Sequence, residues 1–263
     1  MPTRILQLSD FHLFKTTDNC YAGIPVYDSL VEVLRFVQDN YANCDRIVIT
    51  GDMTHDGTNE AYNQLRQVID PFVSRCLFIP GNHDRRESIS EVFPEAAGDF
   101  PGKITFSVVV NGWRLIGLDS LIEGQVDGSI DRCQLQWLRT QLQSHSDQKT
   151  FIFIHHPPIS VDCAWLDKIG LTDNRELVQL ISESDQIQAI FTGHVHQEFS
   201  GTIGNVPVLG VPSTCIQFAP HSQTPTYDSM PPGLRIIEFN DDNFCERVIR
   251  LPEINYVPDQ LQS

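Results

Sequence analysis

Five short apolar segments of this chain each run directly into a cluster of aspartate, asparagine or histidine residues. The segments are expected to be strands, and the clusters that follow them are Ser9-Asp10-Phe11-His12, Gly51-Asp52, Gly81-Asn82-His83-Asp84, His155-His156 and Gly193-His194-Val195-His196. Ligands of open α/β sheets collect beyond the carboxyl ends of the strands. One such residue alone is more often a turn former or a structural residue. Their repetition at separate strand ends predicts one shared binding site.

The first third of the chain predicts a parallel sheet flanked by helices. Strands are expected at residues 4–9, 46–50 and 76–79, each with an apolar run. Helices are expected between them, the second over about residues 59–72 and the first with apolar residues at helical spacing, namely Tyr27, Leu30, Val31, Leu34 and Val37. Three strands separated by helices make a βαβαβ unit, whose strands run parallel and end at one edge of the sheet.

The remainder mixes parallel and antiparallel signals. Asn111-Gly112 is a strong hairpin signal between strands at 104–110 and 113–118. Asp131 with Gln134 resembles a capping box that opens a helix through Leu142. Further strands are expected at 150–154 and 187–192, and short β segments near 198–203, 206–210, 233–239 and 244–251. No repeat or linker is found, so one domain with two sheets is expected over residues 1–263, with C-terminal β segments from about 198–251.

Composition and charge narrow the classes of function. The 263 residues include 34 Asp and Glu against 18 Lys and Arg, a formal net charge of -16. Such a chain repels polyanions, so we expect no nucleic-acid polymer as a partner. The seven cysteines include no CxxC pair, which argues against a disulfide framework or a zinc knuckle. Because we find neither a signal-peptide pattern nor a run that could cross a bilayer, we expect a cytoplasmic protein without a membrane segment.

The side chains at the strand ends suit metal ions. Imidazole and carboxylate donors without thiolate are typical of zinc, iron and manganese sites rather than of copper(I), iron–sulfur or calcium sites. The clusters offer more donors than one ion takes from protein, but they fit two ions that share a carboxylate. Two ions about 3.5–4 Å apart activate water and clamp a phosphate oxygen. The pattern therefore predicts a two-metal site for phosphoester hydrolysis.

Five motifs, in order, resemble those of the calcineurin-like metallophosphoesterases. They are DFH at 10–12, GD at 51–52, GNHD at 81–84, HHPP at 155–158 and GHVH at 193–196. Four more segments resemble the bacterial class III cyclic-nucleotide phosphodiesterases of the CpdA type, namely LDS at 118–120, CAWLD at 163–167, PSTCIQF at 212–218 and PGLR at 232–235. The resemblance covers Arg4 to about Leu251. It implies a four-layer αββα sandwich with two mixed central sheets.

The resemblance also implies roles for individual residues. Asp52 would bridge two ions (Fe, Mn or Zn), the first bound by Asp10, His12 and His196 and the second by Asn82, His155 and His194. His155 is favoured over His156 because the ligand in this family stands two residues before a proline, here Pro157. His156 would then orient the ligands from behind.

His83 has a different role in the resembling enzymes. There the histidine after the ligating asparagine contacts the phosphate and protonates the departing oxygen. An imidazole suits this task because its ordinary pKa lies near neutrality. Asp84 would either orient that imidazole or cap the following segment. Contacts with the substrate are also expected from Asn82 and His196.

The subgroup resemblance implies hydrolysis of 3′,5′-cyclic AMP to 5′-AMP by a hydroxide that bridges the ions. Trp165 and Phe218 would stack on the adenine, with Gln217 and His221 near its polar edges; simple packing of the two aromatic rings onto the core is an equally good interpretation. Other small phosphodiesters, either 2′,3′-cyclic nucleotides or glycerophosphodiesters, are the alternative substrates. A non-catalytic scaffold is a third hypothesis, although it predicts decayed ligands. We expect a monomer or a homodimer.

Overall fold

Two β-sheets form the centre of the molecule. A computed structural model describes residues 2–98, 100–254 and 256–259. The five-stranded sheet has the order β17 (Phe244–Arg250), β16 (Gly233–Phe239), β1 (Thr3–Leu8), β4 (Arg46–Thr50) and β5 (Cys76–Ile79). The six-stranded sheet has the order β12 (Phe199–Ile203), β13 (Val206–Gly210), β11 (Ile187–Thr192), β9 (Thr150–Ile154), β7 (Trp113–Leu118) and β6 (Phe106–Val110).

Both sheets combine parallel strands with antiparallel edges. In the first sheet β1, β4 and β5 are parallel, which confirms the predicted βαβαβ unit, and β16 pairs antiparallel with β1. In the second sheet β7, β9, β11 and β13 are parallel, and β6 and β12 pair antiparallel at the edges. The parallel strands of each sheet therefore end at one edge of that sheet.

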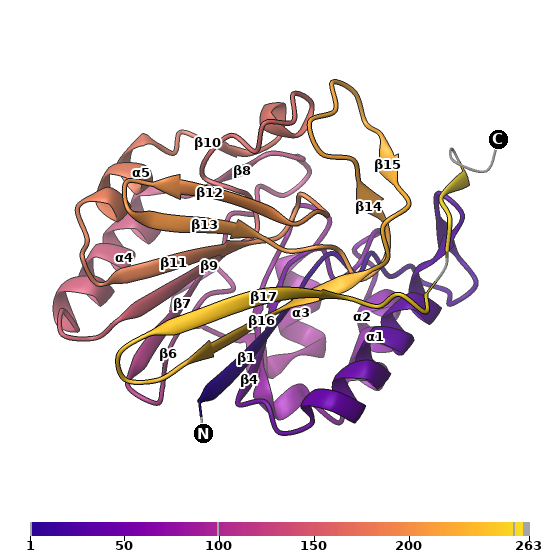
Figure 1. The fold of residues 1–263 in the computed structure, drawn as a ribbon, viewed down its shortest axis with the longest axis horizontal. Coiled ribbons are helices and arrows are strands. Elements are labelled where there is room, and N and C mark those ends of the chain that lie inside the picture. Colours follow the sequence, from indigo (N-terminus) through magenta and orange to yellow (C-terminus); the bar gives the residue numbers. More distant parts are fainter. Residues whose placement is uncertain (1, 99, 255, 260–263) are drawn as a thin grey trace.

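Helices cover the outer face of each sheet (Figure 1). The apolar cluster outside the five-stranded sheet includes residues of α1 (Val26–Tyr41), α2 (Asn59–Ile69) and α3 (Arg86–Val92). The cluster outside the six-stranded sheet includes residues of α4 (Arg132–Ser144) and α5 (Arg175–Ser182). Between the sheets lies a third cluster with residues from both, among them Ile5, Val48, Phe151, Phe191 and Ile237. The predicted αββα sandwich is confirmed.

Several predicted boundaries differ from the structure by one to three residues. Strand β1 spans Thr3–Leu8 rather than 4–9, β6 begins at Phe106 rather than at 104, and β12 and β17 are each one residue shorter than predicted. Helix α2 ends at Ile69 rather than at Phe72, because Pro71 has no amide hydrogen to continue the helical hydrogen bonds. On α1 the predicted apolar face is partly wrong, since Val33 is buried while Tyr27 and Val31 are only half-buried.

Local turn chemistry explains two of the correct predictions. Asn111 and Gly112 adopt φ angles of 46° and 85°, as a two-residue hairpin between β6 and β7 requires. Asp131 caps α4 by accepting a hydrogen bond from the amide of Gln134 at 2.8 Å. The reciprocal half of the capping box is wrong, because the Gln134 side chain instead bonds the backbone amide and carbonyl of Asp119.

The sequence patterns missed the shortest elements. These include α3 and α5, and three pairs of two-residue strands: β2 (Cys20–Tyr21) with β3 (Ile24–Pro25), β8 (Gly128–Ser129) with β10 (Leu171–Thr172), and β14 (Gln217–Phe218) with β15 (Tyr227–Asp228). Two residues carry no periodicity from which a strand could be predicted. Within the ranges that the structure describes, no helix has the length and apolar character needed to cross a membrane.

Glu238 of β16 generates a prediction about folding stability. Its carboxylate accepts hydrogen bonds from Arg247 at 2.8 Å and from Arg4 at 2.6 and 2.8 Å, and these bonds lower its pKa. A carboxylate with a lowered pKa stabilises the fold above its ordinary pKa, and this contribution is lost as the pH falls through the folded value. We expect E238Q to lower the free energy of unfolding at pH 7 by about 1 kcal/mol.

Urea unfolding at pH 7 and at about pH 3.5 measures this effect. The difference between wild type and E238Q should shrink at the lower pH. As a control, E32Q removes an exposed ion pair with Arg35 on α1 and should change the free energy of unfolding by less than about 0.5 kcal/mol. An E238Q effect of equal size at both pH values would contradict the prediction.

Candidate metal centre

The predicted ligands meet where strand ends of the two sheets approach each other. Asp10 and His12 follow β1, Asp52 follows β4 and Asn82 follows β5; His155 follows β9, and His194 and His196 follow β11. All are buried except Asn82, which is half-buried. Side-chain contacts join the seven residues into one continuous cluster.

One part of the cluster consists of Asp10, His12, Asp52 and His196. The Nε2 atoms of His12 and His196 lie 3.1 Å apart. His196 Nε2 is 3.3 Å from Asp10 Oδ1, and His12 Nε2 is 3.6 Å from Asp52 Oδ2. The ligand atoms of these four residues all lie within 4.8 Å of one another. This group forms the first candidate metal position.

Asn82 is the centre of the second part. Its Oδ1 lies 3.2 Å from His155 Nε2 and 3.0 Å from His194 Nδ1. His155 Nε2 is also 3.4 Å from Asp52 Oδ2, the same oxygen that faces His12. Asp52 therefore stands between the two groups, as a bridging carboxylate would.

The ligand spacing and the hydrogen bonds behind the ligands fit metal ions. Two ligand atoms at about 2.1 Å from one ion, at an angle of 90–109°, are about 3.0–3.4 Å apart, close to the spacing found here. Nδ1 of His155 bonds the carbonyl of Thr50 at 2.7 Å, and Nδ1 of His196 bonds the carbonyl of Ile216 at 2.9 Å. A carbonyl oxygen can only accept a hydrogen bond, so in the neutral imidazole the proton is on Nδ1 and the lone pair of Nε2 is directed into the cluster.

The electrostatics of Asp52 and His155 show that the centre attracts positive charge. Burial alone would raise the pKa of Asp52, but the imidazoles of His155 and His83 hold it well below its usual range. Burial alone would lower the pKa of His155, but the Asp52 carboxylate raises it to about 9. Burial and then His155 lower the pKa of His194 to about 3, so His194 is a neutral donor. The centre thus contains a buried anion that requires a nearby positive charge.

Comparison with known proteins agrees with this geometry. The sequence model of the calcineurin-like phosphoesterase family matches residues 3–198. The chain is 32% identical to the 3′,5′-cyclic adenosine monophosphate phosphodiesterase CpdA of Escherichia coli K12 over 257 residues, which are 97% of this chain and 92% of the relative. The chain belongs to the calcineurin-like phosphoesterase family.

This phosphoesterase is also similar to two other known proteins, one in sequence and one in fold. It is 31% identical over 218 residues to a protein of Arcobacter nitrofigilis named probable glycerophosphodiester phosphodiesterase GpdQ, covering 82% of this chain and 80% of that one. The structure of a dimetal phosphatase from Danio rerio has a TM-score of 0.69 at 16% identity, covering 98% of this chain and all of that one, which shows a shared fold. The predicted family resemblance and enzyme class are confirmed.

Strained backbone brings the side chains of the phosphoesterase into place. Positive φ angles occur at Asp10, His12, Asp52, His194 and His196, between 47° and 68°. Residues other than glycine rarely adopt this conformation, and such outliers gather at functional sites. The extended strands end here, and the left-handed residues turn the ligand side chains toward a common centre.

The hydrogen bonds of His155 and His156 distinguish the roles of the two residues. His156 Nδ1 is 2.8 Å from Ser120 Oγ, and His156 Nε2 is 3.2 Å from the carbonyl of Val126. Both of its nitrogens thus have partners outside the cluster, although its ring lies 4.6 Å from that of His194. This arrangement favours His155 over His156 as the ligand, and His156 meets the ligands His155 and His194 through ring contacts.

His83 lies beside the ligands and faces a hollow of about 420 Å³ lined also by His55, Asn82, Arg85 and Glu123. Its Nδ1 is 3.0 Å from the carbonyl of His55, and its amide donates to Asp52 Oδ1 at 2.9 Å. The Nε2 atom is therefore the nitrogen left to face a substrate.

Asp84 does not cap the following segment as predicted, because α3 begins after Arg85 without a side-chain cap. Its carboxylate accepts hydrogen bonds from the amides of Gly81, Met53 and Thr54 and from the Tyr62 hydroxyl, at 2.8 to 3.3 Å. It bonds the loop after β5 to the loop after β4, and no hydrogen bond joins it to His83 among the described residues. Arg86, two residues after the GNHD motif, donates two hydrogen bonds of 2.7 Å to the buried carboxylate of Asp119 in the LDS motif.

The residues predicted to contact the adenine base mostly bond or pack against other protein residues. Phe218 is 7% exposed and stacks on His196 at 4.2 Å, and Trp165 lies edge-on to Phe218 and donates to Ser222 Oγ at 3.0 Å. Gln217 is buried and bonds backbone carbonyls, whereas His221 is exposed and pairs with Asp162.

Sequence patterns did not identify three residues around the site, of which Tyr21 and His55 contact His12 and Tyr227 contacts Tyr21. Half-buried Tyr21 contacts the His12 ring edge-on at 5.2 Å, and Tyr227 lies 6.3 Å from Tyr21. His55 lies 5.4 Å from His12 and 4.6 Å from His83. None of the three is in the five strand-end motifs, so only tertiary contacts reveal them.

Gly81 provides a test of how tightly the centre is built. A Cβ atom at this position would lie 2.2 Å from Asp52 Oδ1 and 2.7 Å from His155 Cε1. We expect G81A to displace both side chains and to weaken binding of Mn²⁺ by about 10-fold or more. Calorimetric titration with Mn²⁺ measures this change.

The control is G170A, because a Cβ atom there meets nothing closer than 3.7 Å. G170A should bind Mn²⁺ as wild type does. Circular dichroism would establish that both variants are folded, and unchanged Mn²⁺ affinity in folded G81A would contradict the prediction.

Proposed function

We propose that this chain is a phosphodiesterase that binds two metal ions and hydrolyses 3′,5′-cyclic AMP to 5′-AMP. The observation that carries the proposal is the pair of donor groups that share Asp52 and lie next to His83. A single ion would leave donors of this buried cluster unused.

Different residues would bind the two ions. Asp10, His12 and His196 would hold one ion, and Asn82, His155 and His194 the other, with Asp52 between them. Iron, manganese and zinc all accept such nitrogen and oxygen donors. When bound, the ions supply positive charge to phosphate oxygens and a water molecule of lowered pKa as the nucleophile.

His83 would act on the leaving group. With its Nδ1 proton donated to the carbonyl of His55, its Nε2 is free to donate a proton to the departing 3′ oxygen of the ribose. Without that proton the oxygen would leave as a poor alkoxide. Asn82 and His196, which line the same centre, would also contact the phosphate.

The identity of the substrate rests on the relatives. The Escherichia coli relative is named a 3′,5′-cyclic adenosine monophosphate phosphodiesterase, and the similarity covers 97% of this chain. The Arcobacter relative supports a second candidate, a glycerophosphodiester, at 31% identity over 82% of this chain. Both candidates are small diesters and would use the same metal centre.

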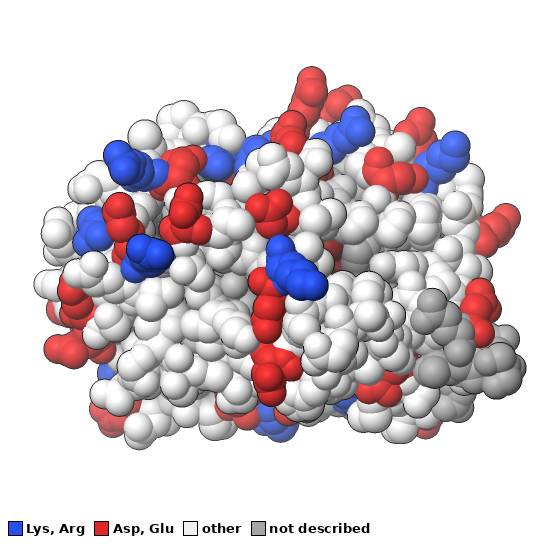
Figure 2. Space-filling view, turned by 90° about the horizontal axis from the view of Figure 1, so that it is seen from above, with Lys and Arg blue, Asp and Glu red and all other residues white. Residues whose placement is uncertain are grey.

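Surface charge supports a small substrate over a nucleic-acid polymer. On the face shown in Figure 2, Lys and Arg side chains are dispersed among Asp and Glu rather than gathered into a stripe. The net charge of -16 would repel a polyanion. The non-catalytic scaffold loses support because the donors and His83 lie together.

The division of roles between Asn82 and His83 gives a pair of opposed predictions. N82A should weaken metal binding, because it removes the oxygen that faces His155 and His194. H83A should retain both ions and lower kcat by about 100-fold, the effect of losing a general acid. Metal analysis after dialysis, together with turnover at saturating Mn²⁺, measures both.

H145A is the matched control, because His145 stands at the C-terminal end of α4. Among the described contacts of the His145 side chain, the hydrogen bond is to the carbonyl of Gln141. It should keep metal content and turnover. Loss of metal from H83A would show that the roles are divided wrongly.

A substrate panel tests the proposed substrate. Metal-loaded protein should hydrolyse 3′,5′-cyclic AMP with a higher kcat/KM than 3′,5′-cyclic GMP, 2′,3′-cyclic AMP or a glycerophosphodiester. Turnover of the glycerophosphodiester with no hydrolysis of cyclic AMP would replace the proposed substrate by the second candidate.

A further inference from the structure

His55 is held against the metal centre by a short ladder of backbone hydrogen bonds. The amide of His12 donates to the carbonyl of Asp52 at 3.0 Å, that of Leu13 to Met53 at 3.2 Å, and that of His55 to Leu13 at 2.8 Å. The loop after β4 therefore runs beside the loop after β1. This pairing fixes His55 next to His12.

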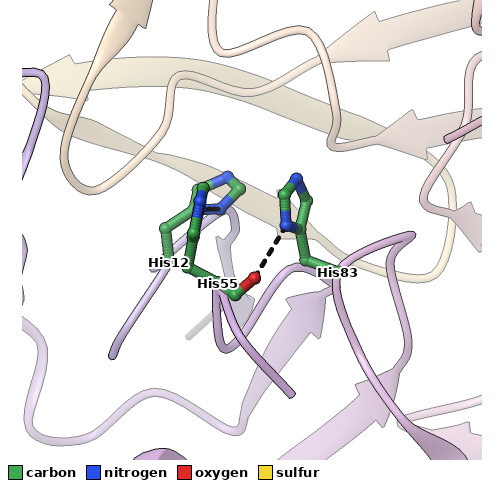
Figure 3. A group of neighbouring side chains, drawn as sticks. All are labelled: His12, His55 and His83. Atoms are coloured by element: carbon green, nitrogen blue, oxygen red, sulfur yellow. Dashed lines mark hydrogen bonds between the residues drawn. The ribbon is translucent and has the colours of Figure 1, made fainter. Parts of the chain in front are cut away.

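The imidazole of His55 lies beside those of His12 and His83 (Figure 3). Two aromatic residues also pack against it. It stacks on the His83 ring at 4.6 Å with an interplanar angle of 27°. On other sides it contacts Phe14 at 4.6 Å and Tyr21 at 4.8 Å. Its backbone carbonyl bonds His83 Nδ1, so His55 holds the proposed general acid by both its ring and its main chain.

The side chain of His55 also meets His12. The two Nδ1 atoms are 3.3 Å apart. His12 Nε2 faces His196 and Asp52, where a bound ion would take its lone pair. A neutral imidazole has one proton, which must then be on His12 Nδ1 and can be donated only to a lone pair on His55 Nδ1.

We propose that His55 is a positioning residue with two separable effects, a role that rests on the proposed function because it requires an ion bound by His12. Its Nδ1 accepts the proton of His12 and orients that ligand. Its ring holds the His83 imidazole in place for proton donation. The proton of His55 itself is then on Nε2.

Two substitutions separate these effects. H55F keeps an aromatic ring beside His83 and Tyr21 but has no acceptor for His12. H55N offers a side-chain oxygen near the position of Nδ1 but has no ring to stack on His83. Both keep the backbone carbonyl that bonds His83 Nδ1.

Affinity for Mn²⁺ and kcat at saturating Mn²⁺ should respond differently in the two variants. H55F should bind Mn²⁺ about 10-fold more weakly than wild type, and H55N should bind it nearly as well as wild type. H55N should instead lose at least about 10-fold in kcat, with a smaller loss in H55F, because a displaced His83 donates less effectively. H145F, which removes a histidine outside the site, should match wild type in both.

The outcomes distinguish failure of this role from failure of the proposed function. A wild-type chain that binds no Mn²⁺ would overturn both. If the wild-type chain binds Mn²⁺, either of two results would overturn the role of His55 alone. One is an unchanged affinity for Mn²⁺ in H55F. The other is an equal loss of affinity and of kcat in both variants.

The protonation state gives a measurement that does not depend on activity. In the zinc-loaded wild-type protein, the nitrogen-15 resonances of His55, assigned by their loss in H55N, should show a proton on Nε2 and none on Nδ1. A proton on His55 Nδ1 would overturn the proposed hydrogen bond.

Discussion

The site depends above all on the buried carboxylate of Asp52. One of its oxygens faces both His12 and His155, and the other accepts the amide of His83. These partners follow strands of two different sheets, so one side chain links the two halves of the sandwich. A buried carboxylate is costly unless positive charge or hydrogen bonds compensate for it. Both the geometry and the charge of the centre therefore favour bound cations.

The fold supplies these contacts because of its topology. In each sheet the parallel strands end at one edge, and the apolar cluster between the sheets holds the two edges together. Left-handed residues such as Asp10 and His194 then turn out of the strands toward each other. Gly51, Gly81 and Gly193 stand beside the ligands, where a Cβ atom would meet backbone or side-chain atoms at 2.2 to 3.1 Å. The tight packing restricts the ligand side chains to one arrangement.

Sequence patterns predicted the structural features that depend on residues adjacent in the sequence. Strands such as Arg46–Thr50 and Cys76–Ile79 contain apolar runs of three or four residues, and Asn111-Gly112 specifies a turn by its own backbone preferences. The convergence of the ligands was predictable because parallel strands share an edge. The extent of a single domain and the assignment of each ligand remain predictions.

Other features depend on residues distant in sequence. The β14–β15 pair joins residues 217–218 to 227–228, and its Phe218 is covered by His196 rather than open to a base. His55 shows no local pattern, since its relation to the site arises from backbone pairing with Leu13. Gln134 fits a capping box by spacing, yet Asp119 competes successfully for its side chain. In each case a tertiary contact determines the role of the side chain.

The most direct measurement of the central claim is anomalous diffraction from crystals of the manganese-loaded protein. Two ions per chain should appear, both within about 2.0–2.3 Å of the Asp52 carboxylate, with His83 and His156 bound to neither. One ion in the cluster, or a second ion bound by His83 or His156, would contradict the two-metal centre proposed for this phosphoesterase.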